Sequence, residues 1–552
     1  MALLGLTDII GPIMVGPSSS HTAGALRIAK MARSLMEEEP LRVKFTLYGS
    51  FSHTQSGHGT DRALVAGILG MQPDDLEIRN SFVHARAKGM QIDFVRSYDN
   101  DNISHPNTVD IEMETKSGDT LTVRGESIGG GAAAITRIDE IYVNITGEHA
   151  NLVIKQRDIR GVLARIANCL AEAQVNIATT TMYRTHRGSI AYTVMEIDDE
   201  ISAETLDLIR QSDGVLSVRL VPASERSALN LTEMNKEAEQ VYYNHLSIPP
   251  EEIEQRFEHA GFSDGVELLQ RCDESHISIG EATRRREEAL RTLEEKPLDI
   301  DAYLNRVLDV MREAAFIPLK TPHKSLGDLI GGESKKFAQA SETKDAPCDS
   351  LTAKAATYAM AVLETNASMG RIVAAPTAGS AGVLPGVLLA LAEERDYSDD
   401  KLRQGLLTAA GIGYLITRNS TVSGAEGGCQ AEVGSAAAMA AAAVVEMAGG
   451  TPKQALSAAS NALVCLMGLV CDPVGGLVEV PCQKRNASAA AMALVCAQMA
   501  LSGIDNLVNF DETVDAMDAV GRSLPFELRE SALGGLAATP SACAACKGCA
   551  AL

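Results

Sequence analysis

The pattern of hydrophobic and polar positions changes twice along the chain. In residues 1–148, short segments in which hydrophobic and polar residues alternate, at 42–51, 76–80, 109–127 and 138–145, are mixed with a helical stretch at 23–39. Alternation with a period of two predicts strands that are buried on one face, and a period near 3.6 predicts helices. We therefore expect residues 1–148 to form an N-terminal α/β domain.

Residues 149–222 are expected to form a small separate module. Strand patterns at 151–156, 176–184, 189–197 and 215–221 are interrupted by helical patterns at 162–174 and 203–212. This βαββαβ order is that of a ferredoxin-like module. The stretch QRDIRGVLARIANCLAEAQVNI, with the later GVLSVRLV, resembles the ACT family of amino-acid-sensing domains, which usually carries Pro where this chain has Ile159. The resemblance implies an amino-acid effector, although the same fold also serves as a packing or dimerisation unit.

The second half of the chain is expected to be helical. Residues 223–300 are charged and rich in Glu and Arg, which predicts a helical linker. Residues 301–552 are rich in Ala, Gly and Met, with helical stretches such as AAMAAAAVVEMAGG between Gly-rich loops. This pattern predicts a buried all-α domain whose loops carry the functional site. The predicted fold class is thus multidomain, with an α/β domain, an ACT-like module and an all-α catalytic domain.

Charge and composition exclude several classes of protein. The 552 residues include 49 Lys plus Arg and 72 Asp plus Glu, a formal charge of −23, which argues against a nucleic-acid partner bound through bulk charge. Residues 372–392 are uncharged, but their prolines, glycines and alanines argue against a membrane span. The first residues lack the pattern of a secretory signal, and the cysteines number eleven, so we expect free thiols in a reducing cytoplasm.

Three cysteines stand out because they occur in loops of one predicted domain. Cys429, Cys471 and Cys482 lie beside glycine, proline or acidic residues. Three such thiols can meet around a metal, and an iron–sulfur cluster with only three protein ligands leaves one iron open for chemistry. Their spacing is also compatible with zinc or with simple burial. The cysteines that lie within apolar helical patterns, and that we expect in the core, are Cys169, Cys465 and Cys496.

Six motifs together resemble the iron–sulfur-dependent L-serine dehydratases over nearly the whole chain. They are GPSSSHTAGA, GSFSHTQSGHGTDRALVAG, SHPNT, GRIVAAPTAGSAGVLPG, SGAEGGCQAEVGSA and GLVCDPVGGLVEVPCQKRN. The resemblance implies that the β and α parts of that family are fused here around the ACT-like module. It also implies a 4Fe-4S cluster, no pyridoxal phosphate, and conversion of L-serine to pyruvate and ammonia. Its cluster ligands fall on Cys429, Cys471 and Cys482.

The same resemblance implies a fourth ligand from the C-terminal tail. Family members can place a C-terminal cysteine on the fourth iron in the resting state, where substrate must displace it. In this chain the cysteines of the tail are Cys543, Cys546 and Cys549. They could instead form a metal site of their own or lie in a mobile tail.

The chemistry of serine dehydration needs a group to help the hydroxyl leave and a base for the Cα proton. A Schiff base to pyridoxal phosphate is the common solution, but the Gly-rich loops PTAGSAG, AEGGCQ and DPVGG contain no lysine, which leaves a Lewis acid. His21, His53, His58 and His105 lie among Ser, Thr, Gly and Asn residues that are typical of loops and anion pockets. The resemblance favours His58 as the base, with His21 and His105 positioning substrate or moving protons and Asn107 assisting. Alternatively, each histidine satisfies a loop hydrogen bond.

Several polar residues are expected to bind the charged ends of the substrate. Four hydroxyl residues precede a predicted helix, whose N-terminus can hold a carboxylate, although Ser20 or Thr22 could simply cap it. They are Ser18, Ser19, Ser20 and Thr22. In the α part, PTAGSAG and the preceding Asn366 could bind the amino acid, and residues just after Cys482 could balance the cluster's charge, bind carboxylate or form an ordinary salt bridge. The residues meant here are Asn366, Thr377, Ser380, Arg485 and Asn486.

We therefore expect a cytoplasmic homodimer that binds L-serine at the junction of its histidine-bearing and cysteine-bearing domains. Three alternatives remain at this point. The substrate could be threonine or another hydroxy-amino acid, the protein could be a regulator that senses an amino acid and oxygen or iron, or it could be a zinc-binding structural protein.

Overall fold

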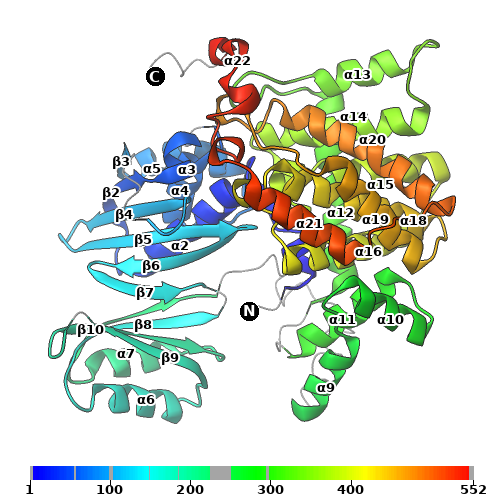
Figure 1. The fold of residues 1–552 in the computed structure, drawn as a ribbon. Helices are drawn as coiled ribbons and strands as arrows, with labels where there is room; N and C mark the ends of the chain where they lie inside the picture. Colours follow the sequence, from blue (N-terminus) through cyan, green and yellow to red (C-terminus); the bar gives the residue numbers. More distant parts are fainter. Residues whose placement is uncertain are drawn as a thin grey trace. The chain divides into compact units, whose positions relative to one another are not determined.

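The chain folds into two compact units in a computed structural model that describes residues 4–54, 57–97, 103–147, 149–184, 186–223, 250–293 and 298–545. The α/β unit comprises Ser20–Glu225, and the helical unit comprises Arg226–Leu552 together with the N-terminal segment Met1–Ser19 (Figure 1). An α/β domain followed by a helical domain is the order that the sequence predicted.

A six-stranded sheet forms the first part of the α/β unit, in the order β3-β2-β4-β5-β6-β7. Among its described strands, β2 and β3 pair in parallel and the other neighbours pair antiparallel. Alternation decides the face that is buried: Val43, Phe45 and Leu47 of β2 lie in the core, and Ile28 of the covering helix α2 (Ala25–Ser34) meets the sheet at Gly125. The strands are β2 (Pro40–Leu47), β3 (Gln91–Arg96), β4 (Thr108–Thr115), β5 (Thr120–Gly129), β6 (Ala132–Ile138) and β7 (Ile141–Ile145).

One local prediction in this part is wrong, and the structure excludes one alternative that the sequence left open. Residues 76–80 form a 3₁₀ helix, η2 (Leu76–Asn80), rather than a strand, because the Asp75 carboxylate accepts a hydrogen bond from the Glu77 N–H at 2.8 Å and caps a helical turn. Ser20 and Thr22 do not cap α2. They lie inside a π-helical turn, η1 (Ser19–Gly24), that runs directly into α2, whose N-cap residue Gly24 has no capping side chain.

A four-stranded antiparallel sheet with two helices forms the second part of the α/β unit. Its strand order is β11-β8-β10-β9, and Figure 1 shows both helices on one face of the sheet. Leu152 and Ile154 of β8 and Ile166 and Leu170 of α6 belong to one buried cluster. The elements are β8 (Ala150–Arg157), α6 (Val162–Glu172), β9 (Ile177–Arg184), β10 (Ile190–Ile197), α7 (Ala203–Gln211) and β11 (Val215–Val221). Membership of the ACT family stays a prediction.

The helical unit is built around an alanine-rich helix, α18 (Ser435–Met447), in which every residue is buried. Small side chains let neighbouring helices pack closely, and α16, α19 and α20 all contact α18. The other long helices are α9 (Pro250–Ala260), α10 (Gly265–Ser275), α11 (Ile279–Leu293), α12 (Ile300–Lys320), α13 (Glu333–Ser341), α14 (Ser350–Ala367), α15 (Val383–Arg395), α16 (Asp399–Asn419), α19 (Pro452–Leu466), α20 (Cys482–Leu501) and α21 (Phe510–Ser523).

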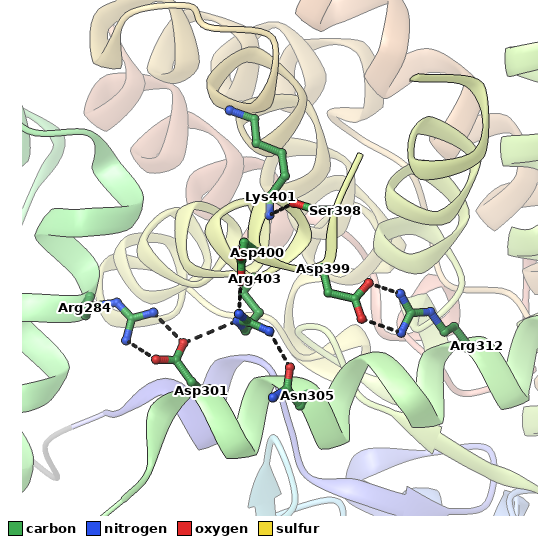
Figure 2. Close-up of polar contacts among 9 residues, drawn as sticks. All are labelled: Arg284, Asp301, Asn305, Arg312, Ser398, Asp399, Asp400, Lys401 and Arg403. Carbon is green, nitrogen blue, oxygen red and sulfur yellow. Dashed lines mark hydrogen bonds and ion pairs between the residues drawn. The ribbon is translucent and has the colours of Figure 1, made fainter. Parts of the chain in front are cut away.

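The predicted linker is in fact part of this unit where the structure describes it. Helix α11 packs against α16, and its N-terminus is held by the Glu446 carboxylate of α18, which accepts from the Gly280 N–H at 3.2 Å. Figure 2 shows a further polar network in which Arg284 of α11 and Arg403 of α16 both contact Asp301 of α12, at 2.7 Å and 3.5 Å. Helices from the predicted linker and the predicted all-α domain therefore share one core.

The first residues of the chain also belong to the helical unit, whereas the sequence assigned them to the α/β domain. Strand β1 (Ile13–Val15) pairs antiparallel with β12 (Arg371–Val373), and the short helix α1 (Leu6–Ile9) is tied to α11 by a hydrogen bond of 2.8 Å from the Leu6 N–H to Glu287. The Tyr303 hydroxyl donates to the Ile10 carbonyl at 2.6 Å. These contacts join residues far apart in the sequence, so local sequence patterns do not predict them.

The buried thiols are not all where the helical patterns predicted them. Cys496 is buried and Cys169 is half-buried, but Cys465 is exposed because it lies with Val464 on the outer face of α19. Among the described helices, none combines the length and the apolar character that crossing a bilayer requires.

Candidate active site

The structure brings Cys429, Cys471 and Cys482 together within the helical unit, and we call these three residues the thiol site. Cys429 follows the one-turn helix α17 (Gly424–Gly427), Cys471 lies in the loop after α19, and Cys482 is the first residue of α20. Cys429 and Cys471 are buried and Cys482 is partly exposed. The charges of Cys429 and Cys482 both raise the pKa of Cys471, which requires the three thiols to be near one another.

Backbone contacts fix the loops that carry these thiols. The side chain of Gln430, next to Cys429, accepts from the Gly468 N–H at 2.8 Å and donates to the Met517 carbonyl at 2.9 Å. Cys471 is held by two backbone hydrogen bonds of 2.9 Å, to Leu528 and from Glu530. The segments around Cys429 and Cys471 are therefore tied to each other and to the C-terminal part of the unit.

The loop before Cys482 is pinned by a buried carboxylate. Glu479 accepts hydrogen bonds from the Ser325 hydroxyl at 2.5 Å and from the backbone N–H groups of Gly327 and Leu329 at 2.7 and 3.0 Å. A buried carboxylate with several donors is strongly held. Glu479 thereby fixes the start of α20 and the position of Cys482.

Arg485 supplies positive charge to the thiol site. Its guanidinium donates to the Val470 carbonyl at 2.8 Å, pairs with Asp472 at 2.8 Å, and also forms a hydrogen bond to Cys429 that opposes the rise in the pKa of that thiol. The salt bridge considered from the sequence is therefore present. It also positions the guanidinium beside the thiols rather than away from them.

Burial keeps the thiols protonated unless a cation replaces the proton. Desolvation raises the pKa of Cys429 to about 12, and it raises the pKa values of Cys471 and Cys482 well above their ordinary range, with nearby acidic groups adding to the effect. A metal group binds thiolates and would displace these protons. Three clustered thiols beside an arginine fit a group with thiolate ligands.

The spread of the thiols distinguishes two kinds of metal group. Within the described residues, no three cysteine Sγ atoms lie within 4.8 Å of one another. Thiolates on a single zinc ion, with Zn–S bonds of about 2.3 Å, would be only about 4 Å apart. The described thiols are therefore not arranged as three ligands of a single zinc ion would be.

Two buried acids beside the thiols were missed by the sequence analysis. Burial raises the pKa of Glu432 to about 7, and burial together with the charge of Glu432 raises the pKa of Glu530 well above its ordinary value. The Glu432 carboxylate accepts a hydrogen bond of 2.7 Å from the Thr377 hydroxyl. Glu432 could have been noticed three residues after Cys429, but nothing local marks Glu530.

Residues 376–380, which we call the PTAGS loop, carry two of the expected substrate-binding residues. The hydroxyls of Thr377 and Ser380 lie 3.1 Å apart. Asn486 of α20 donates to the Gly379 carbonyl at 2.9 Å and accepts from the Gly382 N–H at 3.1 Å. Asn366 of α14 donates to the Ala378 carbonyl at 2.8 Å. The structure thus gathers Thr377, Ser380, Asn366 and Asn486 around one loop.

The N-terminal segment reaches the same loop. The Ser19 hydroxyl accepts a hydrogen bond from the Ala378 N–H at 2.8 Å, and the Pro17 carbonyl accepts one from Asn366 at 3.4 Å. Ser18, which the sequence singled out, is buried in this segment. Ser19, one of the serines that precede the predicted helix, therefore binds this loop through its side chain.

The expected catalytic histidines gather within the α/β unit. The rings of His21 and His58 stand at 89° with centroids 4.4 Å apart, and His21 Nε2 lies 2.8 Å from the Ser50 hydroxyl. Ser20 lies 3.0 Å from His21 Nδ1, and the Thr22 hydroxyl donates to the His58 carbonyl at 2.7 Å. Ser20 and Thr22 thus hold the histidines.

Burial keeps both of these imidazoles neutral. It lowers the pKa of His58 to about 4, and burial with the charges of His58 and His105 lowers the pKa of His21 well below its ordinary value. A neutral imidazole has one nitrogen that accepts a proton. His58 is therefore in the form that a general base requires near neutral pH.

His105 and Asn107 lie together in the segment before β4. His105 Nδ1 accepts from the Asn107 N–H at 3.1 Å, and the Asn107 side chain donates to the Ser127 carbonyl at 3.4 Å. The Asn107 Oδ1 atom is buried and accepts no hydrogen bond from the described residues. Such an acceptor is costly unless a ligand or water satisfies it.

Only one of the tail cysteines lies among the described residues. Cys543, in α22 (Pro540–Ala545), is exposed, and its thiol donates to the Ala537 carbonyl at 3.9 Å. The turn before α22 is tied near the thiol site because the Leu536 N–H donates to Asp472 at 2.7 Å. Cys546 and Cys549 lie outside the described residues.

Comparison with known proteins decides the family. The family model of the serine dehydratase alpha chain matches residues 263–537, and that of the serine dehydratase beta chain matches residues 6–137. The L-serine dehydratase alpha chain of Peptoniphilus asaccharolyticus is 44% identical over 271 residues, which cover 49% of this chain and 92% of that protein. The chain belongs to the serine dehydratase family.

Other members of the serine dehydratase family have one or two chains. The beta chain of the L-serine dehydratase of Peptoniphilus asaccharolyticus is 41% identical over 195 residues, which cover 35% of this chain and 87% of that protein. The L-serine dehydratase of Helicobacter pylori (strain ATCC 700392 / 26695) is 28% identical over 544 residues, 96% of this chain and 97% of that protein. The predicted fusion of the beta and alpha parts of this family is confirmed.

Proposed function

We propose that the protein is an L-serine ammonia-lyase that converts L-serine to pyruvate and ammonia. The observation that carries the proposal is the convergence of Cys429, Cys471 and Cys482 in the unit that matches the alpha chain of serine dehydratase. Relatives that align over almost the full chain and are named L-serine dehydratase support the choice of substrate. Loss of water from serine gives aminoacrylate, which regains water on hydrolysis to pyruvate and ammonia.

The proposal includes a 4Fe-4S cluster held by the three thiols, without pyridoxal phosphate. When bound, such a cluster supplies an open iron that acts as a Lewis acid toward the hydroxyl group of serine. Arg485 balances the charge of the thiolates from its position against Asp472 and Cys429. One of Cys543, Cys546 and Cys549 is proposed as the fourth ligand of the resting enzyme.

We assign the removal of the Cα proton to His58. Its low pKa leaves the ring neutral and able to accept a proton at the pH of the cytoplasm. His21 lies edge to face against His58 and is itself held by Ser50 and Ser20, so it orients the base. His105 and Asn107 complete the group and are proposed to move the proton onward and to contact the substrate.

Each unit, taken by itself, offers polar groups that we propose as candidates for binding the substrate's charged ends. In the helical unit these are Asn366, Thr377, Ser380 and Asn486 around the PTAGS loop, with Arg485 and Ser18. In the α/β unit they are Ser20 and Thr22, which also hold the histidines. The proposal further includes a cytoplasmic homodimer and an amino-acid effector at the ACT-like module.

Anaerobic turnover tests the function. Protein reconstituted with iron and sulfide is incubated with L-serine or L-threonine, and pyruvate, 2-oxobutyrate and ammonia are measured. We expect pyruvate and ammonia in equal amounts from L-serine. Release of 2-oxobutyrate with no pyruvate would move the assignment to another hydroxy-amino acid. Absence of both products from a fully reconstituted sample would overturn it.

A further inference from the structure

Glu432 carries a carboxylate beside the thiol site that has no cationic partner among the described residues. Its only hydrogen bond comes from the Thr377 hydroxyl, at 2.7 Å, and neither a lysine nor an arginine in the described part of the chain forms an ion pair with it. The neighbouring Glu530 is another acid and does not balance its charge. A carboxylate in such a setting is costly unless it takes up a proton or a cation joins it.

Two glycines show that the chain is built closely around this carboxylate. A Cβ atom on Gly379 of the PTAGS loop would lie 2.8 Å from Glu432 Oε1, and one on Gly424 would lie 2.6 Å from Oε2. Any other residue at either position would force the carboxylate to move. Glycine at these two positions therefore lets the backbone approach the Glu432 carboxylate closely on two sides.

Asn366 provides an independent sign of a missing donor at the PTAGS loop. Its Nδ2 group donates to the Ala378 carbonyl at 2.8 Å and to the Pro17 carbonyl at 3.4 Å. Its Oδ1 atom is buried and accepts no hydrogen bond from any residue that the structure describes. Exchanging the oxygen and nitrogen of this amide would place Oδ1 against two carbonyl oxygens, which cannot donate to it. The positions of Oδ1 and Nδ2 are therefore determined by these two carbonyls. Glu432 accepts a hydrogen bond from Thr377, and Asn366 donates one to Ala378, the next residue of the loop.

We propose that Glu432, together with Oδ1 of Asn366, binds the α-ammonium group of the amino-acid substrate. An ammonium group has one positive charge and three N–H donors, which suits a carboxylate and an unpaired amide oxygen. Glu432 then selects amino acids over hydroxy acids with the same carbon skeleton. This inference rests on the proposed function and names the group that recognises the amino end of its substrate.

The test uses two unreactive analogues of serine. L-Alanine keeps the ammonium group and lacks the hydroxyl, whereas 3-hydroxypropanoate keeps the hydroxyl and lacks the ammonium group. Dissociation constants of both are measured by equilibrium dialysis on the full chain and on Glu432→Gln, with bound iron determined for each sample. We expect Glu432→Gln to bind L-alanine about 10-fold to 100-fold more weakly, the effect of losing a charged hydrogen-bond partner. Binding of 3-hydroxypropanoate and the iron content should not change.

A matched variant controls for the loss of one negative charge. Glu426 is exposed on α17, six residues before Glu432, and Glu426→Gln should leave both dissociation constants unchanged. Equal weakening of both analogues by Glu432→Gln, or of neither, would overturn the inference. Pyruvate release from L-serine by the unsubstituted chain is measured in parallel. Its absence would refute the proposed function, whereas pyruvate release with unaltered alanine binding in Glu432→Gln refutes only the role of Glu432.

Discussion

At the scale of single residues, the environment of each group decides its chemistry. Cys429 and Cys465 are both free thiols of the helical unit, but one is buried beside acids and an arginine and the other is exposed on α19. Burial likewise lowers the pKa of His58 below that of a histidine in water and keeps its ring neutral. Residue type alone therefore does not identify the reactive groups.

Replacing one thiol of the site should remove the metal group. Cys471→Ser is expected to lose most of its bound iron and its absorbance near about 400 nm, and to lose activity by about 100-fold or more, because a ligand is missing. Cys465→Ser, on the exposed face of the neighbouring helix, should behave as the unsubstituted chain does. Full iron content in Cys471→Ser would contradict the assignment of this ligand.

The pKa of His58 predicts an unusual dependence of activity on pH. A base must be unprotonated, so kcat for L-serine at saturating substrate should fall only as the pH drops toward the His58 pKa of about 4, and not around the ordinary histidine value of 6.5. The ratio kcat/KM also reports Glu432, whose pKa is about 7, and is not used for this test. We expect a flat profile from pH about 8 to about 5, with iron content checked at each pH. A descending limb centred near 6.5 that disappears in His58→Asn would show instead a solvated base.

At the scale of elements, the N-terminal segment is a structural part of the site. Strand β1 pairs with β12, directly before the PTAGS loop, and Ser19 and Pro17 bind that loop and Asn366. These contacts join residues more than three hundred positions apart in the sequence. The segment therefore positions the loop on which Thr377 and Ala378 lie.

Removing the Ser19 hydroxyl should loosen this loop. Ser19→Ala leaves the buried Ala378 N–H without its acceptor, which is expected to cost about 1–3 kcal/mol. The melting temperature should fall by a few degrees, roughly, and the KM for L-serine should rise while bound iron stays constant. Ser34→Ala, which loses a local hydrogen bond to Met31 within α2, serves as the control. An unchanged KM in Ser19→Ala would separate the segment from the substrate site.

The sequence predicted much of the fold because its patterns are local. Alternation located β2 and β4, and alanine content located α18. It failed at residues 76–80, where the Asp75 cap outweighs a short alternating pattern. It also failed for the first 19 residues, since their partners, Glu287 and Tyr303, are far along the chain.

The candidate site was predictable to a similar degree and for the same reason. The three thiols stand in recognisable loop motifs, and the structure brings them together. Glu530 joins the site region only through its tertiary contact with Cys471 and could not be predicted from its neighbours in the sequence. Ser19 stands in a recognisable motif, but its contact with Ala378 is long-range. Glu432 lies close to Cys429 in the sequence. It could not be chosen from the sequence, because only the structure shows a carboxylate without a cationic partner among the described residues.

At the scale of the whole molecule, the two matched family regions do not coincide with the two folded units. The beta-chain match begins at residue 6, yet residues up to Ser19 belong to the unit that carries the alpha-chain match. A chain cut at a protease site inserted after Gln240 should therefore stay together, because its N-terminal piece contributes β1 to the other piece. Gel filtration after cleavage measures this. Two pieces that elute separately without denaturant would contradict the assignment of the segment.

The dependence of serine turnover on bound iron tests the central claim most directly. Apoprotein is loaded anaerobically with increasing iron and sulfide, and pyruvate release from L-serine is measured against iron bound per chain. The three-thiol site predicts no activity without iron and a rise that saturates near about four irons per chain. Undiminished pyruvate release from protein that holds no iron would contradict it.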